Sequence, residues 1–185
     1  MNIQSKPPTT ADEFLRWNEG REGKREFVRG RVVEMMINVT RNHWRLSTRL
    51  AQQLISQLGT TEFDIGTADF GVRTPDGIRF PDVLVERFSP EGKALATPAP
   101  LLVAEVLSPS SVADDFGSKA RDYLSVSSLL HYVVVAQDEI GVWVWSRSPD
   151  GWASPERIAD LGQAVPLPAL GVTIDLRSLY LGIVQ

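Results

Sequence analysis

The sequence predicts an α/β fold in which a mixed central β-sheet is flanked by helices. Residues 101–107 are apolar on both faces apart from Glu105, which is typical of a central strand covered by helices on each side. Across 41–58, apolar residues recur every three or four positions and define one face of a long helix. Because 185 residues is an ordinary length for one domain, we expect a single domain spanning 1–185.

The composition restricts the chemistry available to this chain. With 43% hydrophobic and 23% charged residues it is an ordinary globular sequence. It contains no cysteine, which excludes disulfides, thiolate metal sites and covalent cysteine chemistry. Two histidines, His43 and His131, leave little scope for imidazole catalysis. Carboxylates and lysines are therefore the main candidate functional groups.

Charge and hydropathy indicate which partners to expect. A net charge of -4 and a pI near 5.2 argue against tight nonspecific binding to nucleic acid, although a local basic groove can coexist with an acidic average. No apolar run approaches the ~20 residues that span a bilayer, so we expect no membrane partner. Residues 1–8 lack the apolar core of a secretory signal, which favours a cytoplasmic location.

The N-terminal segment predicts a short helix and a hairpin. Thr10 and Glu13 form a capping box that begins a helix ending near Trp17. Strands at 24–28 and 31–36 then flank a turn at Arg29-Gly30. The charge content of this hairpin favours the edge of a sheet.

The long helix at 41–58 ends at Gly59 and places His43 on its sheet-facing side, seven residues before Leu50. A histidine there is more commonly a hydrogen-bonded packing residue than a functional one, and both roles stay open.

After the long helix, residues 62–74 and a turn at 75–77 predict a second hairpin whose return strand carries Asp82. The Pro-rich stretch 86–100 is a surface loop long enough to cover a site.

The second half of the chain continues the sheet. A helix is predicted from Asp114 to Val126, with Lys119 bordering its buried face and with Asp114 and Asp115 complementing the helix dipole. Further predicted elements are strands at 131–136 and 141–146 that form a hairpin, a strand near 152–158, and a helical turn around 176–180. The tryptophans Trp143, Trp145 and Trp152 are expected to close the core rather than to stack on bases.

Asp82, Glu105 and Lys119 together suggest metal-dependent hydrolysis of a phosphodiester. A carboxylate such as Glu105 on a central strand costs several kcal/mol to bury unless something compensates its charge. Mg²⁺, or Mn²⁺ in its place, would do so, with Asp82, Glu105 and a strand carbonyl, that of Val106, as hard oxygen ligands. Lys119 could then position water or stabilise a phosphodiester transition state. Alternatively, Asp82 caps a strand and Glu105 pairs with an arginine.

The sequence also resembles the Uma-two family of restriction-endonuclease-like proteins within the PD-(D/E)XK nuclease superfamily. The resemblance covers most of the chain. It rests on the motifs Arg-Phe-Pro-Asp-Val-Leu-Val at 79–85 and Glu-Val-Leu-Ser-Pro-Ser at 105–110, and on Asp115, Lys119, Tyr123, Arg25-Glu26-Phe27, Gly30 and His43.

The resemblance implies a restriction-endonuclease-like mixed central sheet flanked by helices, with additional hairpins. It also implies that Asp82 and Glu105 bind magnesium and that Glu26 is a further acidic member of the site. The superfamily lysine normally follows the glutamate by two residues, a position held here by Leu107. The resemblance implies that Lys119 replaces it, which requires the first turns of its helix to pack against the strand end bearing Glu105.

We therefore expect a magnesium-dependent endonuclease whose substrate partner is DNA, and a homodimer would suit cleavage of two strands. A catalytically weak or inactive nuclease-fold binding module is the alternative, motivated by the acidic pI and the missing strand lysine. A metal-dependent hydrolase of another phosphoester is a third hypothesis.

Overall fold

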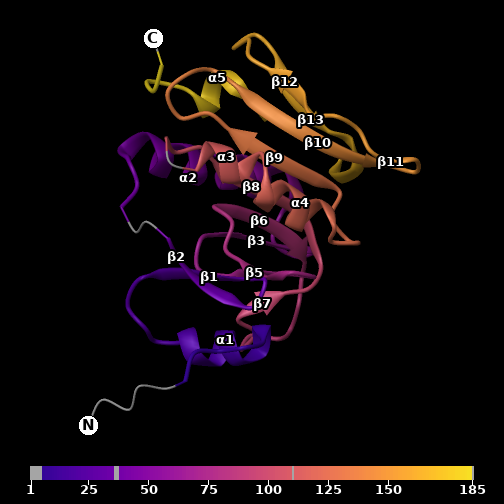
Figure 1. The fold of residues 1–185 in the computed structure, drawn as a ribbon. Coiled ribbons are helices and arrows are strands. Elements are labelled where there is room, and N and C mark those ends of the chain that lie inside the picture. Colours follow the sequence, from indigo (N-terminus) through magenta and orange to yellow (C-terminus); the bar gives the residue numbers. More distant parts are fainter. Residues whose placement is uncertain (1–5, 36–37, 110, 185) are drawn as a thin grey trace.

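The computed structural model describes residues 6–35, 38–109 and 111–184, which fold into two main β-sheets, one small sheet and the helices that cover them (Figure 1). The helices in this part of the chain are α1 (Ala11–Asn18), α2 (Arg41–Leu58), α3 (Val112–Asp115), α4 (Ser118–Leu124), α5 (Leu176–Leu179) and a 3-10 turn at Pro168–Leu170. The strands are β1 (Lys24–Val28), β2 (Arg31–Met35), β3 (Phe63–Thr67), β4 (Gly71–Thr74), β5 (Gly77–Arg79), β6 (Val83–Arg87), β7 (Ala96–Thr97), β8 (Pro100–Val106), β9 (His131–Val135), β10 (Val142–Ser148), β11 (Gly151–Trp152), β12 (Glu156–Ile158), β13 (Ala164–Leu167) and β14 (Val172–Asp175).

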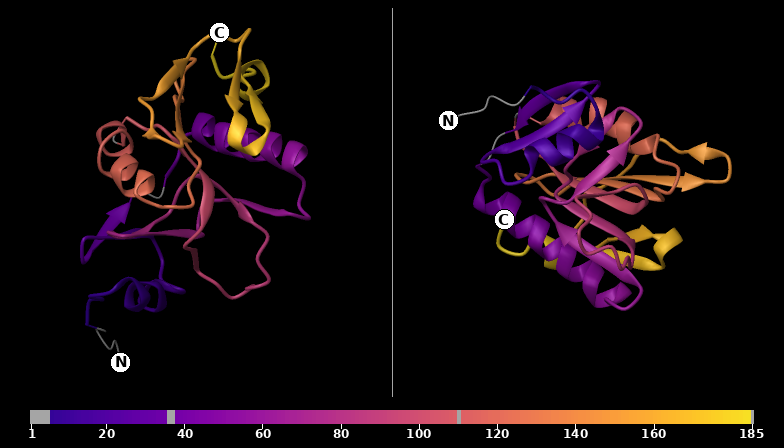
Figure 2. Two further views of the ribbon diagram at one scale, coloured as in Figure 1. Left: turned by 90° about the vertical axis from the view of Figure 1, so that its right-hand side faces the viewer. Right: turned by 90° about the horizontal axis from the view of Figure 1, so that it is seen from below.

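The larger sheet is the predicted mixed sheet between helices. Its strands follow the order β11-β10-β9-β8-β6-β3, with β12 also paired to β10. The central strand β8 pairs with β6 antiparallel and with β9 parallel. Side chains alternate along the strands, so Leu102 and Ala104 pack with α2 on one face while Val103 packs with α4 on the other. Figure 2 shows α2 and the α3–α4 segment on opposite sides of this sheet.

The long helix α2 matches its predicted bounds. The Thr40 side chain accepts a hydrogen bond from the His43 backbone N–H at the start of the helix, and Gly59 ends it with φ 73°. Leu46, Leu50 and Leu54 are almost fully buried against the sheet. Hydrophobic periodicity therefore predicted both the element and its buried face. No helix among the described residues is long and apolar enough to cross a membrane.

The smaller main sheet has the order β2-β1-β5-β4-β7 and packs against α1. The rings of Phe14 on α1 and Phe27 on β1 stack with their centroids 5.5 Å apart. The β1–β2 hairpin turns at Arg29 and Gly30, both with positive φ, as predicted. Its expected edge position holds for β2 alone, because β1 lies between β2 and β5. The predicted last residue of the hairpin, Met36, falls outside the described residues, as does Ser110 of the second motif.

The predicted return strand carrying Asp82 is in fact two strands in two sheets. β5 pairs with β4 and β1 in the smaller sheet, whereas β6 pairs with β3 and β8 in the larger one. The chain crosses between the sheets at residues 80–82, where Pro81 offers no backbone N–H for a ladder. Asp82 therefore lies at the junction of the two sheets, immediately before β6.

The predicted helix from Asp114 to Val126 is likewise two short helices, α3 and α4, separated at Phe116 and Gly117. A Cβ atom at Gly117 would lie 2.4 Å from the Ala113 carbonyl oxygen, so only glycine permits this close approach. Trp145 is buried beside α4, and Trp143 and Trp152 pack partly buried against the same cluster, as predicted.

Candidate active site

The strand register brings the two predicted metal-binding carboxylates together. Val83 of β6 pairs with Ala104 of the antiparallel strand β8. Asp82 immediately precedes Val83, and Glu105 immediately follows Ala104, so the two carboxylates come from adjacent chain segments at this end of the paired strands. The Val106 backbone N–H donates to Asp82 Oδ2 over 2.8 Å, which links the two strands at this point.

Glu105 is buried, with 3% of its surface exposed. The Tyr123 hydroxyl donates to Glu105 Oε1 over 2.9 Å, and Lys119 Nζ lies 3.1 Å from Glu105 Oε2. Burial raises the pKa of Glu105 well above its ordinary value, Lys119 opposes that shift, and the nearby carboxylates of Asp82 and Asp115 reinforce it. The carboxyl group is thus held in place by Tyr123 and Lys119, in surroundings that on balance favour its protonated form.

Lys119 lies in the first turn of α4, which packs against the end of β8 that bears Glu105. Its Nζ also lies 2.9 Å from Asp115 Oδ1, and Lys119 is 4% exposed. Burial by itself lowers the pKa of Lys119, but the adjacent carboxylates outweigh it and the pKa is raised above the ordinary lysine value. Lys119 is therefore a fixed ammonium ion and not a proton acceptor.

Asp115 was expected to be a helix-dipole charge, and the structure corrects this. It is 1% exposed and pairs with Lys119, and its backbone carbonyl accepts from the Tyr132 hydroxyl. The sequence did hold a signal, because Asp115 and Lys119 are four residues apart, the spacing of a helical ion pair. Asp114 is more exposed and accepts a hydrogen bond from Ser118.

His43 lies within the site. Its Nε2 is 3.1 Å from Asp82 Oδ2, the same oxygen that accepts from the Val106 N–H. The imidazole therefore holds Asp82 from the α2 side while the strand holds it from the β8 side. Val106 lines the cavity described below, but its observed contact with Asp82 uses the N–H, and coordination through its carbonyl stays a prediction.

Glu26 occupies a separate buried cluster next to this site. Its Oε2 lies 2.6 Å from Arg79 Nη1, and its Oε1 accepts from the Phe80 backbone N–H. Arg79 also donates to Asp122 Oδ2 from Nε and Nη2, and to the Ser118 hydroxyl. Glu26 therefore fixes the segment that leads into Asp82, whereas a direct part in chemistry stays a prediction.

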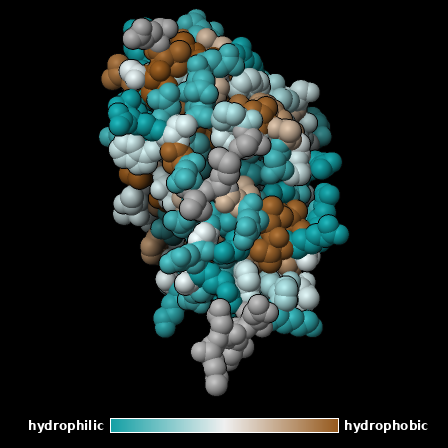
Figure 3. All heavy atoms as spheres, turned by 60° about the vertical axis from the view of Figure 1, so that its left-hand side comes forward, coloured by the Kyte–Doolittle hydropathy of each residue, from teal (hydrophilic) through white to brown (hydrophobic). Residues whose placement is uncertain are grey.

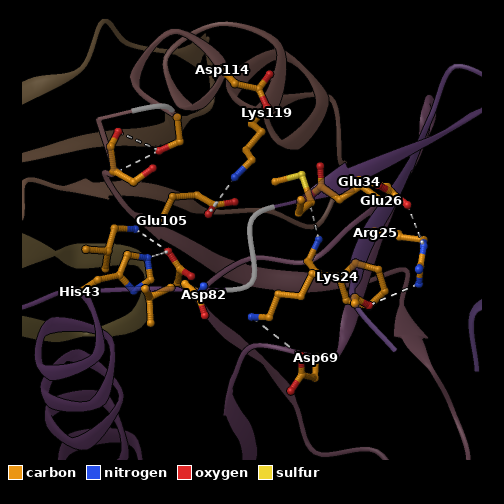
Figure 4. Close-up of a pocket in the computed structure, with 18 of the residues that line it drawn as sticks. Lys24, Arg25, Glu26, Glu34, His43, Asp69, Asp82, Glu105, Asp114 and Lys119 are labelled. Carbon is orange, nitrogen blue, oxygen red and sulfur yellow. Dashed lines mark hydrogen bonds and ion pairs between the residues drawn. The ribbon is translucent and has the colours of Figure 1, made fainter. Parts of the chain in front are cut away.

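A cavity of about 790 Å³ opens onto these groups. Asp82, Glu105 and Lys119 line one part of it, and residues of α1, β1 and β2 line another (Figure 4). The Pro-rich loop contributes Leu95 to the lining, so it borders the cavity. A substrate could therefore reach the carboxylates from solvent.

The donor set suits a magnesium-sized cation. Among the described residues no group of three or more His, Asp or Glu side chains is arranged to hold a metal by itself. Mg²⁺ commonly binds through one or two carboxylates and retains several waters, so Asp82 and Glu105 suffice in number. Burial and Asp82 disfavour the ionised form of Glu105, and a divalent cation beside it would favour that form.

Comparisons with known proteins agree with this fold. Two uncharacterized proteins of Synechocystis, slr1290 and sll1609, are 27% and 29% identical over 181 and 133 residues, covering 96% and 69% of this chain and 94% and 75% of their own. A crystal structure from Anabaena variabilis, described as "a putative nuclease belonging to DUF820", superimposes with a TM-score of 0.76 at 19% identity, covering 94% of this chain and 98% of that one. The model of the Uma2 family, described as "Putative restriction endonuclease", matches residues 11–177, and the chain therefore belongs to this family.

Proposed function

We propose that this protein hydrolyses DNA phosphodiester bonds with Mg²⁺, or Mn²⁺, held by Asp82 and Glu105. The observation that carries the proposal is the position of Asp82, immediately before β6 and bonded to the Val106 N–H, next to Glu105 of β8, with the Lys119 ammonium 3.1 Å from Glu105. Family membership supports a nuclease, since the family is described as "Putative restriction endonuclease".

Each residue has a distinct part in this mechanism. The Val106 N–H and His43 orient Asp82, and the Tyr123 hydroxyl orients Glu105 through Oε1. When bound, the divalent ion would lower the pKa of water and offset charge on the phosphate. Lys119, which stays protonated, would bind a non-bridging phosphate oxygen and stabilise its developing negative charge.

A non-catalytic nuclease-fold binding module is the second candidate, and a specific observation favours it. Both oxygens of Glu105 already have partners, Tyr123 and Lys119. If Lys119 did not release Glu105, the ammonium ion would permanently take the place of the metal. On the other hand, hydrophilic side chains predominate on the face in Figure 3, where hydrophobic residues form separate patches and not one continuous binding surface.

A cleavage assay with matched variants tests the proposal. Wild type, Asp82→Asn and Glu105→Gln are incubated with plasmid, single-stranded DNA and a small phosphodiester in Mg²⁺ or Mn²⁺, and Mn²⁺ binding is measured by calorimetry. We expect each variant to lose about 100-fold or more in DNA cleavage and to bind Mn²⁺ more weakly. Glu62→Gln, at a surface ion pair with Arg87, is the control and should behave as wild type.

The assay also separates the alternatives. Equal cleavage by wild type and both variants would refute the proposed site. Absence of metal-dependent turnover on any substrate would favour the binding module. Turnover of the small phosphodiester but not of either DNA would point to another phosphoester as substrate.

A further inference from the structure

Besides Lys119, the cavity is lined by basic side chains from β1 and from the loop before it. Acidic residues outnumber basic ones along its lining, seven (Glu19, Glu26, Glu34, Asp69, Asp82, Glu105 and Asp114) to four (Arg21, Lys24, Arg25 and Lys119). A polyanionic strand entering such a cavity needs cations along its path in addition to any bound metal. The question is which of the four basic side chains can serve a phosphate.

Three of the four have close partners. Lys119 lies between Glu105 and Asp115, as described above. Arg21 lies over the Trp17 ring at 4.2 Å and donates to the Trp17 carbonyl. The Arg25 side chain is 18% exposed, pairs with Glu34 Oε1 at 3.8 Å, lies 5.7 Å from the same ring and donates to the Gly23 carbonyl. These contacts fix the two arginines against α1 and its following loop.

Lys24 differs from them in the strength of its pairing. Within the described part of the chain its ion-pair partner is Asp69, with Nζ 3.9 Å from Oδ1, at the outer limit of an ion pair. The side chains are 43% and 85% exposed, so water screens the interaction, and exposed pairs of this kind contribute roughly 0–1 kcal/mol. A phosphate can therefore replace Asp69 as the partner of Lys24 at little cost.

The alternation of side chains along β1 places Lys24 on the face that it shares with Glu26. Alternate residues of a strand share a face, so Lys24 lies on the same face of β1 as Glu26, whereas Arg25 and Phe27 face α1. Figure 4 shows Lys24 extending from β1 toward the part of the cavity where Asp82 lies, while Lys119 reaches Glu105 from α4. The bonds from Glu26 to Arg79 and Phe80 fix β1 relative to the segment that carries Asp82.

We infer that Lys24 binds a backbone phosphate of the nucleic-acid strand next to the scissile one. This inference rests on the proposed function and names one of its substrate contacts. Lys24 and Lys119 then hold the strand from two sides of the cavity, one lysine beside the scissile phosphate and the other beside its neighbour. Lys24 acts in binding and positioning, and Asp82, Glu105 and Lys119 remain the groups that act on the reacting atoms.

Binding without turnover tests the inference. The full chain binds a fluorescent duplex or single strand in Ca²⁺, with the strand checked for intactness, and affinity is measured by anisotropy between 50 and 200 mM salt. Loss of one phosphate contact on a duplex reduces the slope of log affinity against log salt by about 0.9, which weakens binding about eightfold at 0.1 M. We expect this result for Lys24→Gln, and near-wild-type behaviour for Lys24→Arg.

Lys93→Gln makes the same charge change at an exposed residue of the Pro-rich loop that does not line the cavity, and should bind as wild type. Lys24→Gln binding with the affinity and salt slope of Lys93→Gln would overturn the assignment of Lys24 while leaving the nuclease proposal intact. If wild type itself binds no polynucleotide, both the assignment and DNA as substrate are wrong. Thermal unfolding of each variant checks that the fold is retained.

Discussion

Two buried charge clusters lie side by side in this molecule and differ in how fully their charges are paired. The Arg79 cluster consists of Arg79, Glu26 and Asp122, and the Lys119 cluster of Lys119, Glu105 and Asp115. Each has one cation and two buried carboxylates that are less than 5% exposed, and the exposed carboxylate of Asp114 also lies 3.6 Å from Arg79 Nη1.

The guanidinium of Arg79 uses Nε, Nη1 and Nη2 in a fixed arrangement of hydrogen bonds, which matches the planar donor geometry of arginine. Both clusters reach the cavity, the Arg79 cluster through Glu26 and the Lys119 cluster through Glu105 and Lys119, and the Lys119 cluster has the carboxylate of Asp82 beside it. Burial and ion pairing alone therefore do not identify a reactive site. A carboxyl group with a raised pKa beside an accessible cavity, as at Glu105, is a better indicator.

The largest effect on stability is expected from the Arg79 cluster. Arg79→Met leaves Glu26 and Asp122 buried without their cation, which should lower the free energy of unfolding by about 3–5 kcal/mol. Urea denaturation measures this difference. The control is Arg29→Met, which breaks an exposed pair with Asp76 and should cost at most about 1 kcal/mol. Similar losses for both variants would contradict a structural role for the Arg79 cluster.

The Lys119 cluster should respond in activity more than in stability. Lys119→Met is expected to reduce DNA cleavage about 100-fold or more, because it removes a charge that faces the phosphate. Its loss of stability should be smaller than that of Arg79→Met, since Glu105, whose pKa is already raised, can take up a proton when its cation is removed. Turnover and urea denaturation are measured on both variants, with Lys93→Met as the exposed control. Unchanged DNA cleavage by Lys119→Met would show that the Lys119 cluster, like the Arg79 cluster, has no direct part in activity.

The smallest expected effect is the pH dependence of stability that Glu105 contributes. Its pKa in the folded protein lies above its unfolded value, so between the two values the folded state binds more protons than the unfolded state. Glu105 therefore lowers stability as pH rises through this window, by at most ~1.4 kcal/mol per pH unit for one proton. Glu105→Gln should remove this slope, as followed by urea midpoints from pH 4.5 upward. A steeper fall in the variant than in wild type would show that the shift has the opposite sign.

Local interactions made much of the fold predictable. The spacing of Leu46, Leu50 and Leu54 determined α2 and its buried face, and Thr10 capped α1 as its sequence indicated. Contacts between residues far apart in the sequence could not be predicted. Arg79 meets Glu26 and Asp122 across separations of 53 and 43 residues, and no local pattern encodes such contacts.

Near the site, sequence reasoning identified the residues but not all their surroundings. Asp82, Glu105 and Lys119 do come together, whereas the burial of Asp115 depends on how α4 packs on β8. The break between α3 and α4 depends on a carbonyl approach that only Gly117 permits. The sequence predicted one return strand carrying Asp82, and its division at Pro81 between two sheets required the tertiary structure.

The crossing at 80–82 has a consequence for how the protein is made. In sequence order, β1 and β2 belong to the smaller sheet, β3 to the larger, β4 and β5 to the smaller, β6 to the larger, β7 to the smaller and β8 to the larger. Neither sheet is a continuous segment, so a gene fragment ending between β5 and β6 would divide both. During synthesis the smaller sheet must wait for β7, and the site for α4. Folding should therefore depend on non-local contacts and proceed slowly for a chain of this size.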